Sequence, residues 1–296
     1  MKVSVPGKAL LLGEYAVLEG APAMVAAVSA RAVGRRVPRR GRESPVVQAV
    51  RTAAEALGTT HGGGLEIDTD GFRGPRRNKL GLGSSAASAV AAAALLRGRT
   101  DETVYRAALE GHRAAARGKA SGVDVCAAYR GGVLACAYQP GPVEPLPSEI
   151  PGLHLAIFHL GPSAKTSSFI RACRAAPSWN RWVQELADLA GAGVAAYRSA
   201  DAGLWLNRVR AFGRAMEGLG HDAGVPVVTE PCRRLMDGAE ALGGAAKPAG
   251  AGGGDVAVAW LPDRSRVPEL AEQVGLRALH LSVDPVGLRR EAEALE

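Results

Sequence analysis

Three glycine-rich segments carry residue types that bind phosphate. They are residues 6–15 (PGKALLLGEY), 79–87 (KLGLGSSAA) and 247–255 (KPAGAGGGD). In the middle segment, Gly81 and Gly83 allow the main chain to approach a ligand closely, and two serines open an apolar helix. Free N–H groups at a helix start favour di- and triphosphates, and a serine hydroxyl there can ligate Mg²⁺. This pattern predicts a loop that holds nucleotide phosphates.

The same pattern has a plainer interpretation, which is a loop before a helix that serine caps. Two other phosphate motifs are excluded, because GxxxxGK[ST] is absent and no βαβ unit with GxGxxG and a downstream acid surrounds the loop. The third segment places four glycines around one alanine, a cost in chain entropy that an ordinary turn does not require. We therefore interpret it as a second ligand loop. The first segment is weak on its own, because a lysine after Pro-Gly is often a solvated loop residue.

Lysine is rare in this chain, at six of 36 basic residues. Because arginine is by far the commoner basic residue in this chain, a lysine indicates a site that needs a compact point charge. Five of the six lysines fall in segments selected on other grounds: Lys8, Lys79, Lys119, Lys165 and Lys247. Residues 165–168 (KTSS) form a loop that leads into a helix, which predicts a second anion site.

One carboxylate, Asp124, lies in the first turn of a helix predicted to follow the segment GKASG. We interpret Asp124 as an acidic residue near the reacting groups. The alternative is a structural role, in which the helix dipole stabilises the aspartate by about 0.3–1 kcal/mol.

The net charge of +7 admits either a nucleic-acid surface or a site for polyanionic small molecules. Basic residues are spread along the chain and aromatic residues amount to 4%, whereas nucleic-acid binders concentrate charge and interleave aromatics. Small molecules are therefore favoured, and nucleic-acid binding is kept as a distant alternative. The four cysteines have no zinc-ligand spacing. The chain starts without a signal-peptide pattern and its most apolar stretch, 86–96, is too short to span a bilayer, so we expect a cytoplasmic protein with no membrane partner.

Hydrophobic periodicity places these residues on an α/β scaffold of two parts. The first part is predicted to contain strands at 2–5, 22–37, 65–69 and 132–138 and helices at 45–57, 84–96, 100–117 and 123–129. Thr100 is predicted as the N-cap of its helix, and a proline-rich linker follows at 140–151. The second part is predicted to contain strands at 153–160, 256–261 and 278–283 and helices at 166–175, 180–199, 201–220, 230–242 and 268–274.

In order and spacing, the three segments together resemble the three motifs of the galactokinase, homoserine kinase, mevalonate kinase and phosphomevalonate kinase (GHMP) superfamily. The resemblance implies an α+β two-domain fold, with a ribosomal-protein-S5-like N-terminal domain that binds ATP (residues 1–151) and a ferredoxin-like C-terminal domain (residues 152–296). It also implies that the middle loop wraps the ATP phosphates, that Ser85 helps to hold Mg²⁺ and that Lys8 lies beside the acceptor. The nucleotide-binding residues are then Lys79, Gly81, Leu82, Gly83, Ser84, Ser85 and Ala86.

The segment that contains Asp124 resembles the SGxD segment shared by mevalonate and phosphomevalonate kinases. Further features similar to phosphomevalonate kinases are residues 243–248, residues 229–231 and His112. Mevalonate kinases carry a metal-binding glutamate eleven residues before the aspartate, where this chain has Arg113, although Glu110 one turn earlier could compensate. The first segment disfavours a diphosphomevalonate decarboxylase, whose N-terminal motif differs.

The chemistry of the acceptor also favours similarity to phosphomevalonate kinases over mevalonate kinases. Mevalonate offers a neutral hydroxyl, for which a base is useful, whereas the phosphate of 5-phosphomevalonate has a second pKa of about 6 and needs nearby positive charge instead. Lys119 and Lys165 suit that need. We therefore expect ATP- and Mg²⁺-dependent phosphorylation of 5-phosphomevalonate to 5-diphosphomevalonate by a monomer or homodimer. Mevalonate kinase, or another GHMP small-molecule kinase, is the alternative.

The expected catalytic residues are Lys8, which Glu14 orients, and Asp124, which positions Lys8 or the metal. The expected substrate-binding residues are Lys8, Glu14, Lys119, Ser121, Gly122, Lys165, Thr166, Ser167, Lys247, Gly250, Ala251, Gly252 and Gly253.

Overall fold

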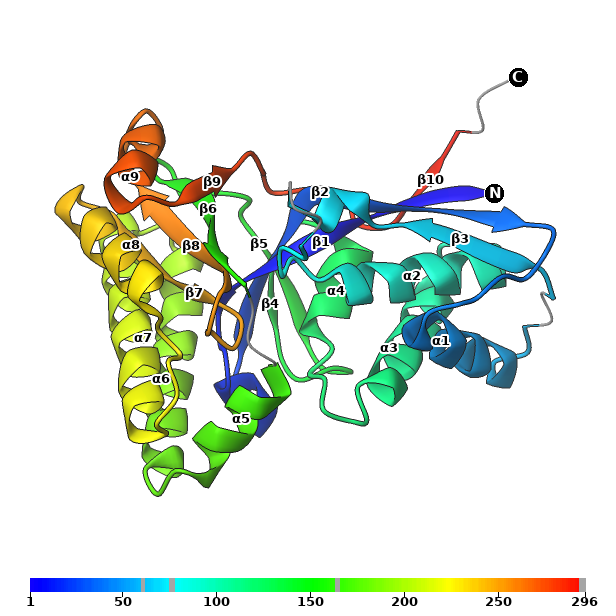
Figure 1. Ribbon diagram of the computed structural model, residues 1–296, viewed down its shortest axis with the longest axis horizontal. Coiled ribbons are helices and arrows are strands. Elements are labelled where there is room, and N and C mark those ends of the chain that lie inside the picture. The colour runs from blue at the N-terminus through cyan, green and yellow to red at the C-terminus, as the bar shows by residue number, and fades with distance from the viewer. Residues whose placement is uncertain (60–61, 75–77, 163–165, 293–296) are drawn as a thin grey trace. The chain divides into compact units, whose positions relative to one another are not determined.

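The computed structural model describes residues 1–59, 62–74, 78–162 and 166–292. The chain folds into two compact units that interleave in sequence (Figure 1). Unit 1 contains Met1–Lys8, Ala26–Gly132 and the segment from Val283 onward, and unit 2 contains Ala9–Val25 and Val133–Ser282. The α+β content agrees with expectation. The predicted domain boundary after residue 151 is a division along the sequence and stays a prediction.

Unit 1 contains an antiparallel sheet built on two long strands. Its strand order is β10–β1–β2, with β3 also paired to β2. The strands are β1 (Lys2–Leu12), β2 (Ala23–Val37), β3 (Gly64–Asp68) and β10 (Arg289–Glu291). The first strand was predicted at 2–5, and this was too short, because β1 continues through most of the first glycine-rich segment as far as Leu12. The reason is burial: the side chains of Ala9, Leu11 and Leu12 belong to the core.

Four helices accompany this sheet and lie grouped together in Figure 1: α1 (Pro45–Ala56), α2 (Ser84–Arg97), α3 (Glu102–Ala115) and α4 (Val123–Arg130). The central helix is α2, because residues 86–96 are all buried and each of the other three helices packs on it. An alanine-rich helix without a polar face suits that position. The predicted N-cap at Thr100 was wrong, since Asp101 caps α3 by accepting a hydrogen bond from the main-chain N–H of Thr103.

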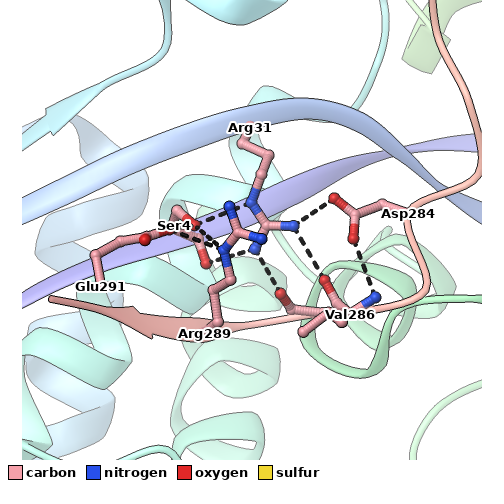
Figure 2. Close-up of polar contacts among 7 residues, drawn as sticks. Ser4, Arg31, Asp284, Val286, Arg289 and Glu291 are labelled. Atoms are coloured by element: carbon pink, nitrogen blue, oxygen red, sulfur yellow. Dashed lines mark hydrogen bonds and ion pairs between the residues drawn. The ribbon is translucent and has the colours of Figure 1, made fainter.

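One arginine helps to fasten the segment from Val283 onward to strands β1 and β2. Figure 2 shows Arg31, on β2, at the centre of a polar cluster. Its guanidinium donates to Ser4, to the carboxylate of Asp284 and to the main-chain oxygens of Val286 (3.0 Å) and Gly287 (2.7 Å). All its N–H-bearing nitrogens are engaged, so the cluster ties β1, β2 and the returning segment together.

Unit 2 contains a four-stranded antiparallel sheet with the order β7–β8–β6–β9. These strands are β6 (His154–Gly161), β7 (Ala245–Ala249), β8 (Asp255–Leu261) and β9 (Arg277–Leu279). A hairpin of β4 (Val133–Cys136) and β5 (Val143–Leu146) also belongs to unit 2. The predicted linker at 140–151 was therefore wrong in part, because β5 lies within it. Sequence reasoning also missed β7, where Pro248 is tolerated because β7 is an edge strand.

The α-helices in the described part of unit 2 are α5 (Thr166–Ala175), α6 (Trp179–Arg198), α7 (Ala202–Asp222), α8 (Glu230–Ala241) and α9 (Arg266–Val274). Helices α7 and α8 both pack on β7, and α6 runs beside α7 (Figure 1). Trp205 anchors this core edge-on to Tyr197 and Trp260, with ring centroids 4.9 Å apart in both pairs. Within the described residues, none of the helices combines the length and hydrophobicity needed to span a lipid bilayer.

Candidate functional site

The middle glycine-rich segment forms a tight loop that opens α2 in unit 1. Gly81 (φ 73°) and Gly83 (φ 82°) both adopt the left-handed conformation that favours glycine, and Gly83 is the N-cap of α2. Because Gly83 has no side chain, it cannot satisfy the first N–H groups of the helix itself. Ser85, in the first turn, is exposed. This geometry supplies an open helix N-terminus of the kind that binds anions.

Strand β1 holds this loop through its main chain. The N–H of Lys8 donates to the carbonyl of Leu82 at 2.8 Å. A Cβ on Gly7 would lie 2.6 Å from that same carbonyl oxygen, so glycine is required for the close approach. The stem of Lys8 lies against Gly83, where an added Cβ would be 2.8 Å from Lys8 Cγ. The fold thus sets Lys8 directly beside the predicted phosphate loop.

The flanks of the loop differ in their exposure. Leu80 and Leu82 are buried and anchor the loop, so Leu82 offers only its main chain to a ligand. Lys79 is exposed, and its main chain pairs with Arg73 in an isolated bridge.

Asp124 lies in the first turn of α4, after the left-handed N-cap Gly122 (φ 83°). One carboxylate oxygen accepts a hydrogen bond from the N–H of Val125 (2.9 Å), and the other lies 3.8 Å from Nε2 of His112. His112 is buried, and its Nδ1 has no hydrogen-bond partner among the described residues. About a quarter of the Asp124 side chain, 26%, remains exposed and accessible to a ligand.

Arg113 organises the segment that precedes Asp124. Its guanidinium donates to the carbonyl oxygens of Ala120 and Ser121, at 3.3 Å each. A glutamate at this position could not donate these bonds, because an ionised carboxylate only accepts. Lys119 is exposed beside this arginine-held turn. Sequence reasoning treated Arg113 only as a departure from a pattern, whereas the structure gives it contacts of its own.

In unit 2, Glu14 and Lys247 form a buried ion pair. The Nζ of Lys247 lies 2.5 Å from Oε1 of Glu14, and the two side chains are 0% and 1% exposed. The same Oε1 accepts the N–H of Gly250 at 3.1 Å. The Lys247 ammonium also lies 5.5 Å from the ring centroid of Phe212.

This burial changes the expectation for both residues. The two side chains are almost fully buried, and one oxygen of Glu14, Oε1, is engaged by Lys247 and Gly250. The other oxygen, Oε2, is buried without a hydrogen-bond partner among the described residues, and the expected orientation of Lys8 by Glu14 stays a prediction. Both side-chain hydrogen bonds of Glu14 are made with residues of the third glycine-rich segment, Lys247 and Gly250. The pair therefore positions that segment.

The third segment is a loop shaped by four consecutive positive φ angles from Gly252 (76°) to Asp255 (58°), after Gly250 at 99°. A Cβ on Gly252 would lie 2.1 Å from the carbonyl oxygen of Val227, and the N–H of Gly253 donates to that same oxygen at 3.0 Å. The loop is packed tightly at Gly252 and open at Gly250, where nothing lies within 4 Å of an added Cβ.

Tyr15 also holds this loop, and sequence reasoning did not assign it a role. Its hydroxyl donates to the carbonyl of Ala251 at 2.5 Å. The backbone of Tyr15 has φ 62° and ψ −53°, a conformation that costs a bulky residue about 1–3 kcal/mol. Burial raises the pKa of the hydroxyl above its usual range, so it remains a donor. No spacing rule reveals such a contact, because the two residues are 236 positions apart.

The predicted second anion site is described only in part. Lys165 lies outside the described residues. Thr166 is the first residue of α5, and its side chain is also outside them, whereas Ser167 is exposed in the first turn. The site stays a prediction.

Two regions of the chain match models of known protein families. Residues 44–132 match the GHMP kinases N terminal domain, and residues 198–279 match the GHMP kinases C terminal domain. The first range lies within unit 1 and the second within unit 2.

Two curated relatives are similar over most of this chain. A phosphomevalonate kinase of Streptomyces sp. strain CL190 is 32% identical over 242 residues, which are 69% of this chain and 64% of that protein. A mevalonate kinase of Aeropyrum pernix is 31% identical over 229 residues, which are 68% of this chain and 67% of that protein. The chain thus spans about two thirds of the length of each relative.

A solved structure matches the fold more completely. The phosphomevalonate kinase of Streptococcus pneumoniae, determined in complex with phosphomevalonate and AMPPNP, superposes with a TM-score of 0.81. The match covers 96% of this chain and 99% of the other at 16% identity. At this identity it supports the similarity of fold alone.

Proposed function

The chain belongs to the GHMP kinase superfamily, with the α+β fold of that superfamily, and we propose that it transfers the γ-phosphoryl group of ATP to 5-phosphomevalonate. The products are 5-diphosphomevalonate and ADP. The similarity to a curated phosphomevalonate kinase supports this choice within the superfamily.

One observation carries the proposal, which is the placement of Lys8 against the loop that opens α2. A lysine stem packs on Gly83, and Gly83 is the N-cap of a helix whose first turn is open. A lysine beside a helix N-terminus suits the adjacent negative charges of a polyphosphate. A structural loop needs neither feature.

The choice of acceptor is supported by the residues before Asp124. Arg113 holds the carbonyls of Ala120 and Ser121, where mevalonate kinases have a metal-binding glutamate. Arg113 in place of that glutamate exchanges a negative charge for a positive one. The change favours an acceptor that is itself anionic. Exposed Lys119 adds positive charge in the same turn.

In the proposed reaction, an oxygen of the 5-phosphate attacks the γ-phosphorus of ATP. The bond from that phosphorus to the β–γ bridging oxygen breaks, and ADP leaves with the electron pair. Lys8 offsets the charge of the two phosphates as they approach. Asp124 acts in positioning and not as an obligatory base, because the attacking phosphate is already largely ionised at neutral pH. In unit 2, we propose that the main-chain amides of residues 250–253 bind a reactant.

The residues present also fit Mg²⁺, which would neutralise phosphate charge if it were bound there. Ser85 is exposed in the first turn of α2 and offers its hydroxyl. No group of three His, Cys, Asp or Glu side chains able to hold a metal occurs among the described residues. Mg²⁺ brought by a nucleotide would not require such a group, because this ion commonly binds through one or two protein oxygens together with substrate phosphates.

The similarity to the A. pernix protein favours a second candidate, which is a mevalonate kinase. A side-by-side assay of ADP release with mevalonate, 5-phosphomevalonate, homoserine and galactose separates the two. We expect kcat/KM for 5-phosphomevalonate to exceed the others by about 100-fold, equivalent to roughly 2.7 kcal/mol of transition-state discrimination. A preference for mevalonate would establish the second candidate and contradict the first. The Lys8→Met variant, purified identically, shows whether any contaminating kinase releases ADP.

A further inference from the structure

A buried histidine lies behind the carboxylate of Asp124. His112 is on α3 and Asp124 is in the first turn of α4, and these two helices of unit 1 pack against each other. The Nε2 atom of His112 lies 3.8 Å from Oδ2 of Asp124. The imidazole is 9% exposed, whereas 26% of the Asp124 side chain is exposed. The histidine therefore contacts the carboxylate from the interior and leaves part of it open to a ligand.

The two nitrogens of this imidazole have different surroundings. Nε2 lies near a carboxylate oxygen, whereas Nδ1 is buried with no hydrogen-bond partner among the described residues. In the neutral side chain, one nitrogen carries the proton and the other has a lone pair. A proton on Nδ1 would leave a buried N–H without an acceptor and would turn a lone pair toward the negative charge of Asp124. A proton on Nε2 avoids both costs, so Nε2–H is the favoured neutral tautomer.

Each oxygen of Asp124 then has a positively polarised neighbour within the protein. Oδ1 accepts the main-chain N–H of Val125 at 2.9 Å, and Oδ2 lies near Nε2 of His112. At 3.8 Å the second contact is longer than a hydrogen bond, so in the free protein it is a Coulombic attraction. Contacts of this kind often tighten when reactants bind. One contact on each oxygen limits rotation of the carboxylate, and neither contact removes its charge.

The residue next to His112 binds the same part of the chain. Arg113 donates to the carbonyl oxygens of Ala120 and Ser121, which precede α4. Adjacent residues of α3 therefore contact the main chain that leads to Asp124 and the Asp124 carboxylate itself. Packing alone is a poor explanation for the histidine, because an apolar side chain would fill the same space without burying a polar nitrogen.

We propose that His112 is a positioning residue, which acts on the reaction by holding the carboxylate of Asp124 in one orientation. The inference rests on the proposed function in one respect, that Asp124 lies among the reacting groups. His112 acts only through Asp124, because its own side chain is almost fully buried.

Two substitutions at position 112 form a matched test. The amide nitrogen of glutamine can occupy the position of Nε2, whereas the shorter asparagine reaches only that of Nδ1. We expect His112→Gln to keep kcat within about threefold of the wild type and His112→Asn to lower it about tenfold, with KM for ATP changed less than about twofold in both. Equal values of kcat in the two variants would overturn the proposal.

A second substitution on α3 controls for lost stability. Leu109 is buried one turn before His112, and Leu109→Ala should lower Tm at least as much as His112→Asn while leaving kcat of the folded protein unchanged. A tenfold loss of kcat in Leu109→Ala would mean that any loosening of α3 slows the reaction, and positioning by His112 would no longer be needed.

A double variant tests whether His112 acts through Asp124. Once Asp124→Asn has removed the charge, adding His112→Asn should lower kcat by less than about twofold further, because residues that act as a unit are not additive. A further tenfold loss would show that His112 acts independently of Asp124 and would overturn the proposal.

Nitrogen NMR of protein labelled at histidine detects the contact without reference to activity. At about pH 8 histidine side chains are largely neutral, and the chemical shifts show which nitrogen carries the proton. The His112 signals are those absent from a variant at position 112. We expect Nε2–H in the wild type and a change of these shifts in Asp124→Asn. Nδ1–H in the wild type, or unchanged shifts in Asp124→Asn, would overturn the inference.

The NMR comparison also separates failure of the inference from failure of the proposed function. If the wild-type protein does not phosphorylate 5-phosphomevalonate, the proposed function fails. The shifts in the wild type and in Asp124→Asn then still decide whether His112 holds the carboxylate of Asp124.

Discussion

The two glycine-rich loops of this protein are held in place by different means. The loop that opens α2 is fixed by main-chain bonds, chiefly from the N–H of Lys8 to Leu82, and by the left-handed glycines themselves. The loop at residues 250–253 also has a main-chain bond, from the N–H of Gly253 to Val227, but two side chains, those of Glu14 and Tyr15, bind it as well. The first arrangement leaves neighbouring side chains available to a ligand, whereas the second commits them to the protein.

This difference has a consequence for mutational sensitivity. A loop fixed by its main chain should keep its shape when a nearby side chain is replaced, and only its chemistry should change. A loop fixed by side chains should lose its shape when one of them is removed. Four measurements test this contrast.

The largest expected effect follows from Lys247→Met, which leaves the Glu14 carboxylate buried without its partner. Removing one member of a buried ion pair costs about 3–5 kcal/mol in the free energy of unfolding. Urea denaturation measures this loss, and amide exchange should show faster opening of residues 250–253 with no change at 81–86. Combining Lys247→Met with Glu14→Gln removes both charges and should recover most of the stability. A single variant within 1 kcal/mol of the wild type would contradict the account.

Replacing Lys8 by Met should change chemistry and not shape. The variant keeps the main-chain N–H that bonds Leu82, so the loop stays in place and the protein remains folded. We expect kcat to fall by at least about 100-fold, because the ammonium that offsets phosphate charge is lost. Lys2→Met, an exposed lysine on the same strand, is the control. Turnover near the wild-type value would remove Lys8 from the mechanism.

A buried ion pair that is distant in sequence from both loops provides a control for this comparison. Glu43 pairs with Arg51 in unit 1, with the two side chains 3% and 4% exposed. Glu43→Gln should lower the free energy of unfolding by about 1–3 kcal/mol and leave amide exchange in both loops unchanged. Faster exchange in either loop would show that loss of any buried charge loosens them.

The Glu43 pair also predicts a pH dependence. Hydrogen bonds from Arg51 lower the pKa of the Glu43 carboxyl below its ordinary value of about 4.5. Its stabilising contribution is therefore present above pH 4.5 and is lost as the pH falls through the lower pKa of the folded state. The difference in stability between the wild type and Glu43→Gln should shrink over that acidic window. A difference that stays constant down to the lowest pH at which the protein folds would contradict the charge-based explanation.

The smallest expected effects come from placing alanine at equivalent positive-φ positions in the two loops. Gly83→Ala and Gly250→Ala should each cost about 1–2 kcal/mol of stability, because both positions favour glycine. The Cβ at position 83 meets the Lys8 stem, whereas the Cβ at position 250 meets nothing. Gly83→Ala should therefore reduce kcat about tenfold more than Gly250→Ala. Equal losses of kcat would mean that the space around Lys8 does not matter.

Local patterns were sufficient to predict most of the fold. Helix α1 was predicted at 45–57 and lies at Pro45–Ala56, because proline at its first position and apolar spacing both act within the segment. Strands β5, β7 and β10 were missed for a common reason. They are three to five residues long, and each depends on a partner strand that a local pattern does not identify.

The candidate site was predictable to the same extent. Glycines and lysines that act through their own segment, such as Gly83 and Lys8, are recognisable by type and spacing. Glu14 and Lys247 were predicted to bind substrate, but their mutual burial is a tertiary property that composition does not reveal. Tyr15 was missed because its partner, Ala251, lies 236 positions away in the sequence.

The polar cluster around Arg31 has a consequence for biosynthesis. Arg31 and its carboxylate partner Asp284 are separated by 253 positions, and nearly all of unit 2 is encoded between them. A ribosome therefore completes the sequence of unit 2 before the guanidinium of Arg31 acquires its partners Asp284, Val286 and Gly287. Until then the nascent chain exposes the free edge of β1, a row of unpaired amides and carbonyls to which a chaperone or another unfinished chain can attach.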